Sequence, residues 1–503
     1  MDLTYLIYLF LIGAITYWYF KSIHSHWTKQ NIPSVPDPLP IFGHMLPAII
    51  MKENVSDFVQ RAYNNFKASF VGFYFMHKPG IIVRDPDLVK CVLQTNYSSF
   101  RDNFVALSEK NDPLMARSPF FTNDVNTWKE GRNRISNHLS AKQLKYLFAV
   151  SEEVCNRMST FMERKIQENG ESYEVNLKNL FTRCTGELVA NAAFAIEGQS
   201  FEDNPEDLSF TKVTKTLFES SFVKEILLFF FPSIAHFFGV SLLQTKTEEY
   251  MRQNIKSILE KRQRTGSAPN DYLQFTTELN ANFDDILADV VNFYVDTYDT
   301  TSSAVANLFY NLSRNPDIQT KLRDHIMSVL KDANGQVTYE SLKNMTYLEQ
   351  VIHESMRMTP SLAFQPKRCT EEITLKGNDG LTCHLKPGDP ILIPVVGIQH
   401  DEKYWPNPEI FDPDRFSPEN RAKNNRYTFL AFGEGPRICV GIRLALMLVK
   451  QITASLIIRF VIEHSSKTKV PLEYEASPIF FGFKGGLWGR FKKLSLSSQE
   501  SKL

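Results

Sequence analysis

The chain has 503 residues, and 43% of them are hydrophobic, which is enough to bury a large core. Its 56 lysines and arginines equal its 56 aspartates and glutamates, so it lacks the positive excess that is typical of nucleic-acid binding. The six cysteines, at positions 91, 155, 184, 369, 383 and 439, show neither CxxC pairing nor a disulfide-framework spacing. These features exclude a basic nucleic-acid binder and a disulfide-stapled secreted domain, and they suit a reducing compartment.

An uncharged, apolar segment lies at the N-terminus. Leu3 to Phe20 carries no formal charge and is near the lower length limit for a membrane-spanning helix. Lys21 and Lys29 follow it, and aromatic residues of the kind found at membrane interfaces lie close by: Tyr17, Trp18, Tyr19 and Trp27. We expect residues 1–20 to form a transmembrane signal anchor, because a cleaved signal peptide would need a basic start and a small-residue cleavage site.

The rest of the chain divides simply. Four prolines within residues 33–40 predict a stiff hinge in a linker over residues 21–40. No further linker or repeat interrupts residues 41–490, so one domain is expected there, followed by a polar tail over 491–503. The tail ends in Ser-Lys-Leu, which equals a peroxisomal import signal. An N-terminal anchor would leave the ribosome first, so we interpret this match as chance.

Local patterns predict strands early in the chain and a long helix later. The strand-like segments Phe70–Phe75 and Ile81–Arg84 indicate a small β region near the N-terminal part. Asp284–Ser313 contains no Gly or Pro and predicts a helix of about 45 Å. Asp299 and Thr300 lie in its middle, where burying an acid beside a hydroxyl would be costly without a purpose. Taken alone, the pair would be interpreted as part of a solvated face.

A second helix is predicted over Met345–Pro360. Glu354 and Arg357 are three residues apart in it and meet on one face. Such a pair alone is weak evidence, since most are surface decoration.

A cysteine lies in a glycine-rich loop over residues 432–441, directly before a helix-forming run. The helix start directs free N–H groups and the positive end of its dipole at the Cys439 sulfur, which predicts a thiolate. Gly435 and Gly441 would let the backbone approach a flat cofactor, and Arg437 offers a cation for its acidic edge. A small buried hydrophobic cysteine is the alternative interpretation.

The full spacing Phe432-x-x-Gly435-x-Arg437-x-Cys439-x-Gly441 resembles the heme-binding signature of the cytochrome P450 family. The resemblance implies a mainly α fold with a long central helix over the heme. It also implies heme b (iron-protoporphyrin IX) as the cofactor, with Cys439 as the iron ligand and the other four residues as cofactor-binding.

Three further positions match the family around the heme. Trp128 and Arg132 fit its Trp-x-x-x-Arg helix, whose indole and guanidinium bind the heme propionates. Arg368 would be another propionate contact by its position. With Arg437, three cations would then face two carboxylates.

The resemblance also gives the charged pair a structural role. In the family, the counterparts of Glu354 and Arg357 are buried and joined by the arginine of a Pro-x-Arg-Phe motif, which is Arg415 here. The three groups would lock the segment that presents Cys439.

By the same resemblance, Thr300 and Asp299 are the catalytic pair that activates oxygen and delivers protons. The chain departs from the family just before this pair, where Asp296-Thr297 replaces the usual Ala-Gly. In the fatty-acid ω-hydroxylase branch, a glutamate at this place can become esterified to heme. We hypothesise that Asp296 either forms a similar link or pairs with a polar group of the substrate.

The implied function is that of a heme-thiolate monooxygenase, most similar to insect-type microsomal members. The expected substrates are lipophilic: xenobiotics such as insecticides, or endogenous hormones and lipids. Electrons would come from NADPH through a membrane-bound cytochrome P450 reductase, with cytochrome b5 as an optional second partner, at the cytosolic face of the endoplasmic reticulum membrane. Lys129, Arg132 and Arg134 are candidates for docking the reductase. The aromatic tract Ile226–Phe238 would be a membrane contact or a channel entrance.

Two other classes stay open at this point. A heme-thiolate isomerase or dehydratase would need no external electrons, although such branches usually lose the acid-threonine pair. A heme-binding ligand sink without turnover is the other, and the unusual Asp296-Thr297 is compatible with it.

Overall fold

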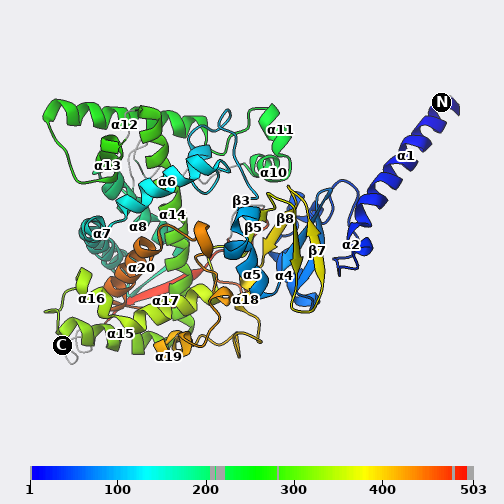
Figure 1. Cartoon of the computed structure of the whole chain (residues 1–503). Coiled ribbons are helices and arrows are strands. Elements are labelled where there is room, and N and C mark those ends of the chain that lie inside the picture. Colours follow the sequence, from blue (N-terminus) through cyan, green and yellow to red (C-terminus); the bar gives the residue numbers. More distant parts are fainter. Residues whose placement is uncertain (1–2, 204–209, 211–220, 280–281, 478–481, 495–503) are drawn as a thin grey trace.

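The helix α14 (Phe283–Arg314) runs through the helical part of the molecule, as predicted (Figure 1). Its start is fixed by the Asn282 side chain, which accepts a hydrogen bond from the Asp284 backbone N–H. Acidic residues in the first turn and Arg314 in the last turn complement the helix dipole. In this computed structural model the described residues are 3–203, 210, 221–279, 282–477 and 482–494. The Ser-Lys-Leu tripeptide at the C-terminus lies outside them.

Helices make up most of the described chain and surround α14 (Figure 1). The helices α8, α17 and α20 pack directly against it. Besides α14, the described α-helices are α1 (Leu3–His24), α2 (His26–Lys29), α3 (Leu46–Ile49), α4 (Val55–Asn65), α5 (Pro86–Lys90), α6 (Val125–His138), α7 (Ala141–Glu168), α8 (Leu177–Phe194), α10 (Phe222–Phe230), α11 (Pro232–Phe237), α12 (Thr245–Thr265), α13 (Tyr272–Leu279), α15 (Pro316–Lys331), α16 (Tyr339–Asn344), α17 (Thr346–Met358), α18 (Val395–Gln399), α19 (Pro418–Arg421) and α20 (Ile442–Ile457).

The predicted strands are confirmed, and they belong to a five-stranded sheet of order β1-β2-β8-β5-β3. Its strands are β1 (Phe70–Phe75), β2 (Lys78–Val83), β3 (Asp102–Asn103), β5 (Gln365–Arg368) and β8 (Pro390–Ile393). A three-stranded sheet contains β4 (Ser172–Asn176), β9 (Phe460–His464) and β10 (Trp488–Lys493), and a hairpin joins β6 (Ile373–Lys376) to β7 (Thr382–Leu385). The β structure is therefore not confined to the N-terminal part, because late segments of the chain supply several of the strands.

The helix α1 projects away from the body of the molecule (Figure 1). It continues past Phe20 to His24, so the helix predicted over residues 1–20 is confirmed and is longer than expected. Within the described residues, no helix combines the length and apolarity needed to cross a membrane. The transmembrane span predicted for residues 1–20 is not confirmed.

Trp27 is a core residue rather than the interfacial aromatic that was predicted. Its side chain is fully buried, and its indole N–H donates to the Phe73 carbonyl at 3.0 Å. A Cβ placed on Gly72 would lie 2.6 Å from the indole, so strand β1 leaves room for the ring only because this residue is glycine. The base of α1 and α2 is thereby joined to the sheet.

The charged pair of α17 lies in the core, as the resemblance implied. The Arg357 guanidinium donates to both Glu354 carboxylate oxygens, at 2.8 and 2.9 Å, and both side chains are fully buried. Arg415 reaches the same carboxylate at 3.3 Å. Burial raises the pKa of Glu354, and the hydrogen bond from Arg357 opposes this shift. The two cations thus offset the desolvation of the carboxylate.

We predict that Glu354→Ala destabilises the protein by about 3–5 kcal/mol, because two buried guanidinium groups would lose their shared partner. Thermal unfolding and heme content measure the effect. Glu340→Ala is the matched control, since Glu340 pairs with Lys343 on the surface at 2.8 Å with 64% of its side chain exposed. It should change little, and equal effects of the two substitutions would contradict the prediction.

Candidate active site

The loop before α20 has a fixed shape. The Cys439 backbone N–H donates to the Phe432 carbonyl at 2.9 Å, which closes the loop on itself. Gly435 has a φ of +74°, and a Cβ there would lie 1.8 Å from the Leu93 carbonyl oxygen. Gly435 therefore allows close approach to a neighbouring backbone, and its predicted approach to a flat cofactor stays a prediction. At Gly441, an added Cβ would lie 3.8 Å from the Cys439 sulfur, an ordinary van der Waals contact.

Cys439 lies at the start of α20 with an exposed side chain. Burial among protein atoms raises the pKa of its thiol, and the backbone N–H of Gly441 opposes this. Asp296 raises the same pKa further, while Arg132 lowers it. The thiolate predicted from the helix dipole is therefore not favoured by the protein alone. Coordination to a metal ion would deprotonate the thiol outright.

The cations predicted for the cofactor edge gather beside this loop. The Arg437 guanidinium lies 5.1 Å from the ring centroid of Trp128 on α6, and it donates to the carbonyls of Pro119 (2.9 Å) and Thr122 (3.2 Å). Burial lowers the pKa of Arg132, and the charge of Arg437 acts in the same direction, so the two cations are close. The structure thus brings Trp128, Arg132 and Arg437 together with Cys439.

Arg368 lies elsewhere. Its guanidinium donates to the Phe104 carbonyl at 2.7 Å and lies 5.5 Å from the Phe104 ring. It lines a groove of about 370 Å³ between the β1–β2 hairpin and α10–α11. Arg368 thus contacts Phe104, and its predicted contact with a heme propionate stays a prediction.

The middle of α14 presents two different faces. Asp296 and Thr300 share one face and are exposed, whereas Thr297 and Tyr298 are buried. The Thr300 hydroxyl donates to the Asp296 carbonyl at 2.6 Å. Burial raises the pKa of the Asp296 carboxyl to about 7 although its surface is accessible, so it faces an interior space enclosed by protein. Its effect on the pKa of Cys439 places the two groups around the same space.

Asp299 lies on another side of the same helix. Its carboxylate pairs with the Lys178 ammonium of α8 at 2.7 Å. The same ammonium donates to the Asp299 carbonyl and to the hydroxyls of Ser302 and Ser303, at 2.7–2.8 Å. Burial lowers the pKa of Lys178, and the charge of Asp299 opposes this. Asp299 is therefore held by α8, although it directly precedes Thr300 in the chain.

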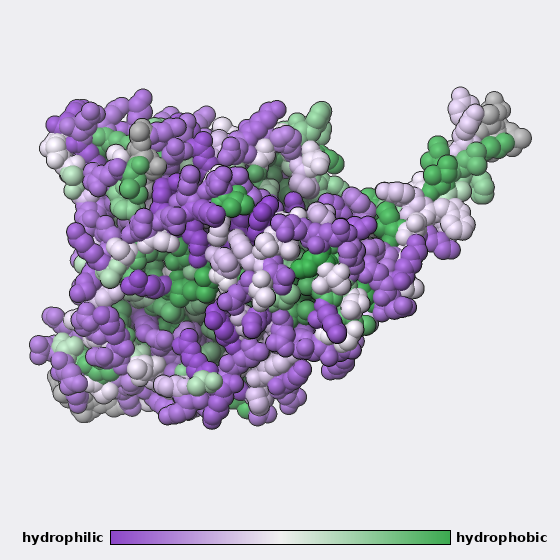
Figure 2. Space-filling model, in the orientation of Figure 1, coloured by the Kyte–Doolittle hydropathy of each residue, from purple (hydrophilic) through white to green (hydrophobic). Residues whose placement is uncertain are grey.

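The residues present fit a heme. Arg437 keeps a buried Nε without a hydrogen-bond partner among the described residues, which suits a further anionic acceptor. The described residues contain no group of three or more His, Cys, Asp or Glu side chains that could hold a metal ion. Heme would need only one thiolate ligand from the protein, and Cys439 could supply it. Figure 2 shows a hydrophobic hollow in the face of the helical part.

Only one of the three candidates for reductase docking is a free surface cation. Lys129 is exposed on α6. Arg134 instead forms a two-pronged ion pair with Asp289, at 2.8 and 2.9 Å. Arg132 is half-buried beside the cysteine loop.

Sequence reasoning missed Tyr97, Lys178 and Lys367. The Tyr97 ring lies 6.0 Å from the Trp128 ring, and Tyr97 also acts on the pKa of Arg437. Lys178 lies near the start of a helix that the sequence analysis did not predict, so no pattern indicated it. The alternation of side chains along β5 could have indicated Lys367, since its residues 365 and 367 share a face.

The cytochrome P450 family model matches residues 33–484, and the chain therefore belongs to the cytochrome P450 family. Cytochrome P450 9e2 of Blattella germanica is 30% identical over 502 residues, covering 92% of this chain and 93% of the relative. Cytochrome P450 6a2 of Drosophila melanogaster is 28% identical over 511 residues, covering 97% and 99%. The resemblance to insect members is confirmed, and members of this family are heme-dependent monooxygenases.

We predict that Cys439→Ser abolishes the red-shifted carbon monoxide band that reduced, thiolate-ligated heme gives, because a serine oxygen does not replace the sulfur donor. Absorption spectra of the reduced, carbon monoxide-treated protein measure this. Cys369→Ser is the control, since Cys369 is buried away from the loop and its thiol contacts the Glu371 carbonyl. An unchanged band in Cys439→Ser would remove this residue as the ligand.

Proposed function

We propose that this chain is a heme-thiolate monooxygenase that inserts one oxygen atom from O2 into lipophilic substrates. The observation that carries the proposal is the gathering of Arg437 and Trp128, 5.1 Å apart, beside the Cys439 loop, with the Arg437 Nε buried and without a hydrogen-bond partner among the described residues. When bound, heme supplies the iron at which O2 is reduced and activated. Cys439 would ligate this iron, while Arg437, Arg132 and Trp128 would hold the acidic edge of the cofactor.

Thr300 and Asp299 would share the handling of protons. The Thr300 hydroxyl donates its hydrogen bond to the Asp296 carbonyl. Its oxygen can therefore accept a hydrogen bond from a water or ligand in the interior space. Asp299 is held in an ion pair by Lys178, so its carboxylate must leave this ammonium before it can carry a proton toward Thr300. The pair would thereby connect the interior to the polar contact between α8 and α14.

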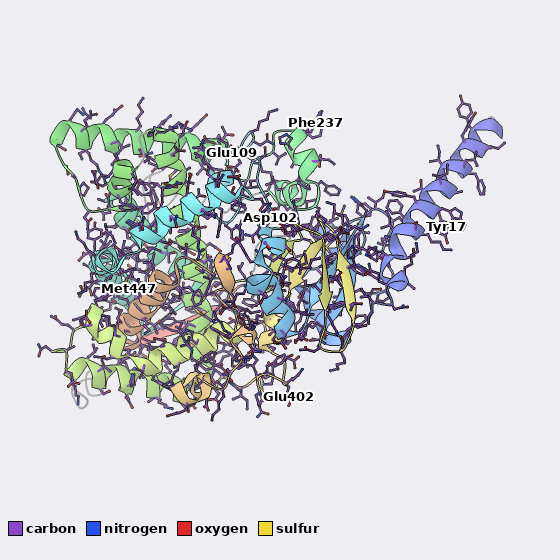
Figure 3. All side chains as sticks on the ribbon, in the orientation of Figure 1. Tyr17, Asp102, Glu109, Phe237, Glu402 and Met447 are labelled. Carbon is purple, nitrogen blue, oxygen red and sulfur yellow. The ribbon has the colours of Figure 1, made fainter. Side chains whose placement is uncertain are left out.

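Apolar surface supports the assignment of substrate and location. The groove under α10–α11 is lined largely by apolar and aromatic residues, including Phe104 and Phe229, which suits lipophilic xenobiotics, hormones or lipids. Phe237 and Phe238, with 81% and 72% exposure, and the exposed apolar residues of α1 support attachment to the endoplasmic reticulum membrane (Figure 3 labels Tyr17 and Phe237). There the chain would meet its NADPH-dependent reductase, and cytochrome b5 as an optional partner.

Reconstitution with reductase tests the proposal. NADPH consumption should require reductase, O2 and a lipophilic substrate, and it should yield an oxygenated product. An isomerase or dehydratase would turn over without reductase, and a ligand sink would consume no NADPH. Thr300→Val should lower product formed per NADPH by about a hundredfold or more if its hydroxyl serves proton transfer, whereas Thr300→Ser should retain it. Equal yields from the two variants would remove Thr300 from this role.

We also propose that Asp296 contacts a polar group of the substrate. The support is an accessible carboxyl on the same face as Thr300, with no ion pair among the described residues. Acid–acetone should extract the heme completely, because an ester to heme would retain it. Asp296→Asn should weaken binding of substrates that carry a cationic amine by about tenfold and leave neutral substrates unchanged. Heme that stays with the protein would favour the ester instead.

A further inference from the structure

The strand β5 directs its basic residues to opposite sides. Side chains alternate along a strand, so Gln365 and Lys367 share one face while Arg368 belongs to the other. The Gln365 side chain donates to the Leu430 carbonyl at 3.1 Å, and a Cβ on Gly433 would lie 3.3 Å from it. The face of Gln365 and Lys367 is therefore turned toward the cysteine loop.

Lys367 is connected to Arg437 through one segment of chain. Its side chain is buried, and its ammonium donates to the Asn103 side-chain oxygen at 2.9 Å. Asn103 in turn donates to the Phe120 carbonyl at 2.8 Å. Arg437 donates to carbonyls within the same segment, residues 119–122. Two cations from distant parts of the sequence thus converge on one loop.

The charge around Lys367 is not balanced. Burial, helped by the charge of Arg437, lowers the pKa of its ammonium to about 7, while Asp102 acts in the opposite direction. Asp102 is the first residue of β3 and lies opposite Arg368 of β5, near the centre of the molecule (Figure 3). It also forms a contact of 3.6 Å with Arg101, so one carboxylate serves several cations. A buried ammonium in such surroundings is stabilised by a further anion.

Arg368 has different surroundings, although its Nε, like that of Arg437, is buried without a hydrogen-bond partner among the described residues. Its guanidinium is engaged with the Phe104 carbonyl and ring, in the groove under α10–α11. The rings of Phe104 and Phe229 lie 6.3 Å apart in the same region. Arg368 therefore has protein partners in the groove, whereas Lys367 contacts Asn103, which binds the segment that Arg437 also binds.

We propose that Lys367, rather than Arg368, pairs with a heme carboxylate beside Arg437. The inference rests on the proposed function, because it takes heme to be the anionic ligand. A lysine would bind the carboxylate differently from an arginine. Its compact ammonium acts as a point charge, whereas a guanidinium is a planar fork with several donors. Lys367 would thus be a positioning residue for the cofactor, and Arg368 would belong to the substrate groove.

Heme retention in the full-length, heme-loaded protein tests the inference. The rate of heme transfer to apomyoglobin would be compared for the wild type, Lys367→Met, Lys367→Arg and the matched control Arg368→Met. Lys367→Met should lose heme about tenfold faster or more, because a charge-assisted hydrogen bond is removed. Lys367→Arg and Arg368→Met should stay within about twofold of the wild type, since each keeps the buried cation.

A second measurement separates this role from a folding defect. Each protein is also loaded with heme dimethyl ester, which has no carboxylates, and serves as its own reference. The ratio of retention of heme to that of the ester should fall in Lys367→Met and remain unchanged in Arg368→Met. The reverse pattern would overturn the inference and leave the proposed function in place. A wild-type chain that takes up no heme would overturn the proposed function itself.

Discussion

The position of Cys439 depends on one buried carboxylate. Glu354 binds Arg357 and Arg415, and Arg357 also donates to the Gln399 carbonyl at 2.8 Å. The Gln399 side chain accepts the backbone N–H of Leu430, at 2.8 Å, at the start of the cysteine loop. A charge removed from water must keep all its partners, so α17, α18 and the loop are held in one arrangement. The desolvated Glu354 carboxylate therefore helps to set the position of the Cys439 thiol, although the two groups are far apart in the sequence.

The interior space is bounded by groups whose charges oppose one another. Asp296 raises the pKa of the Cys439 thiol from across the space, and Arg132 lowers it from the side of α6. Arg437 and Lys367 bring positive charge to a third side. Such a set of charges is better balanced by a dianionic cofactor with a cationic metal than by water alone, which agrees with heme as the resident group.

Segments whose form depends on neighbours in sequence could be predicted, and directions that depend on tertiary packing could not. The absence of Gly and Pro over residues 284–313 predicted α14, and the spacing around Cys439 indicated its loop. Asp299 and Thr300 are adjacent, but a helix turns by about 100° per residue, so they face different partners. The same applies to Lys367 and Arg368, which a strand sends to opposite faces. The position of α8 decides which of Asp299 and Thr300 faces the cofactor. The position of the cysteine loop decides the same for Lys367 and Arg368.

The indole of Trp27 fits against Gly72 and donates to the Phe73 carbonyl, inside the edge of the five-stranded sheet. Trp27 belongs to α2, which follows α1 directly, so extracting this ring from the core would break the hydrogen bond that ties α2 to the sheet. The C-terminal end of α1 is thereby held next to the sheet. Because the groove under α10–α11 is built on the adjoining hairpin, the direction in which it opens is set relative to α1. Any partner that binds α1 would thereby also set the direction in which this groove opens.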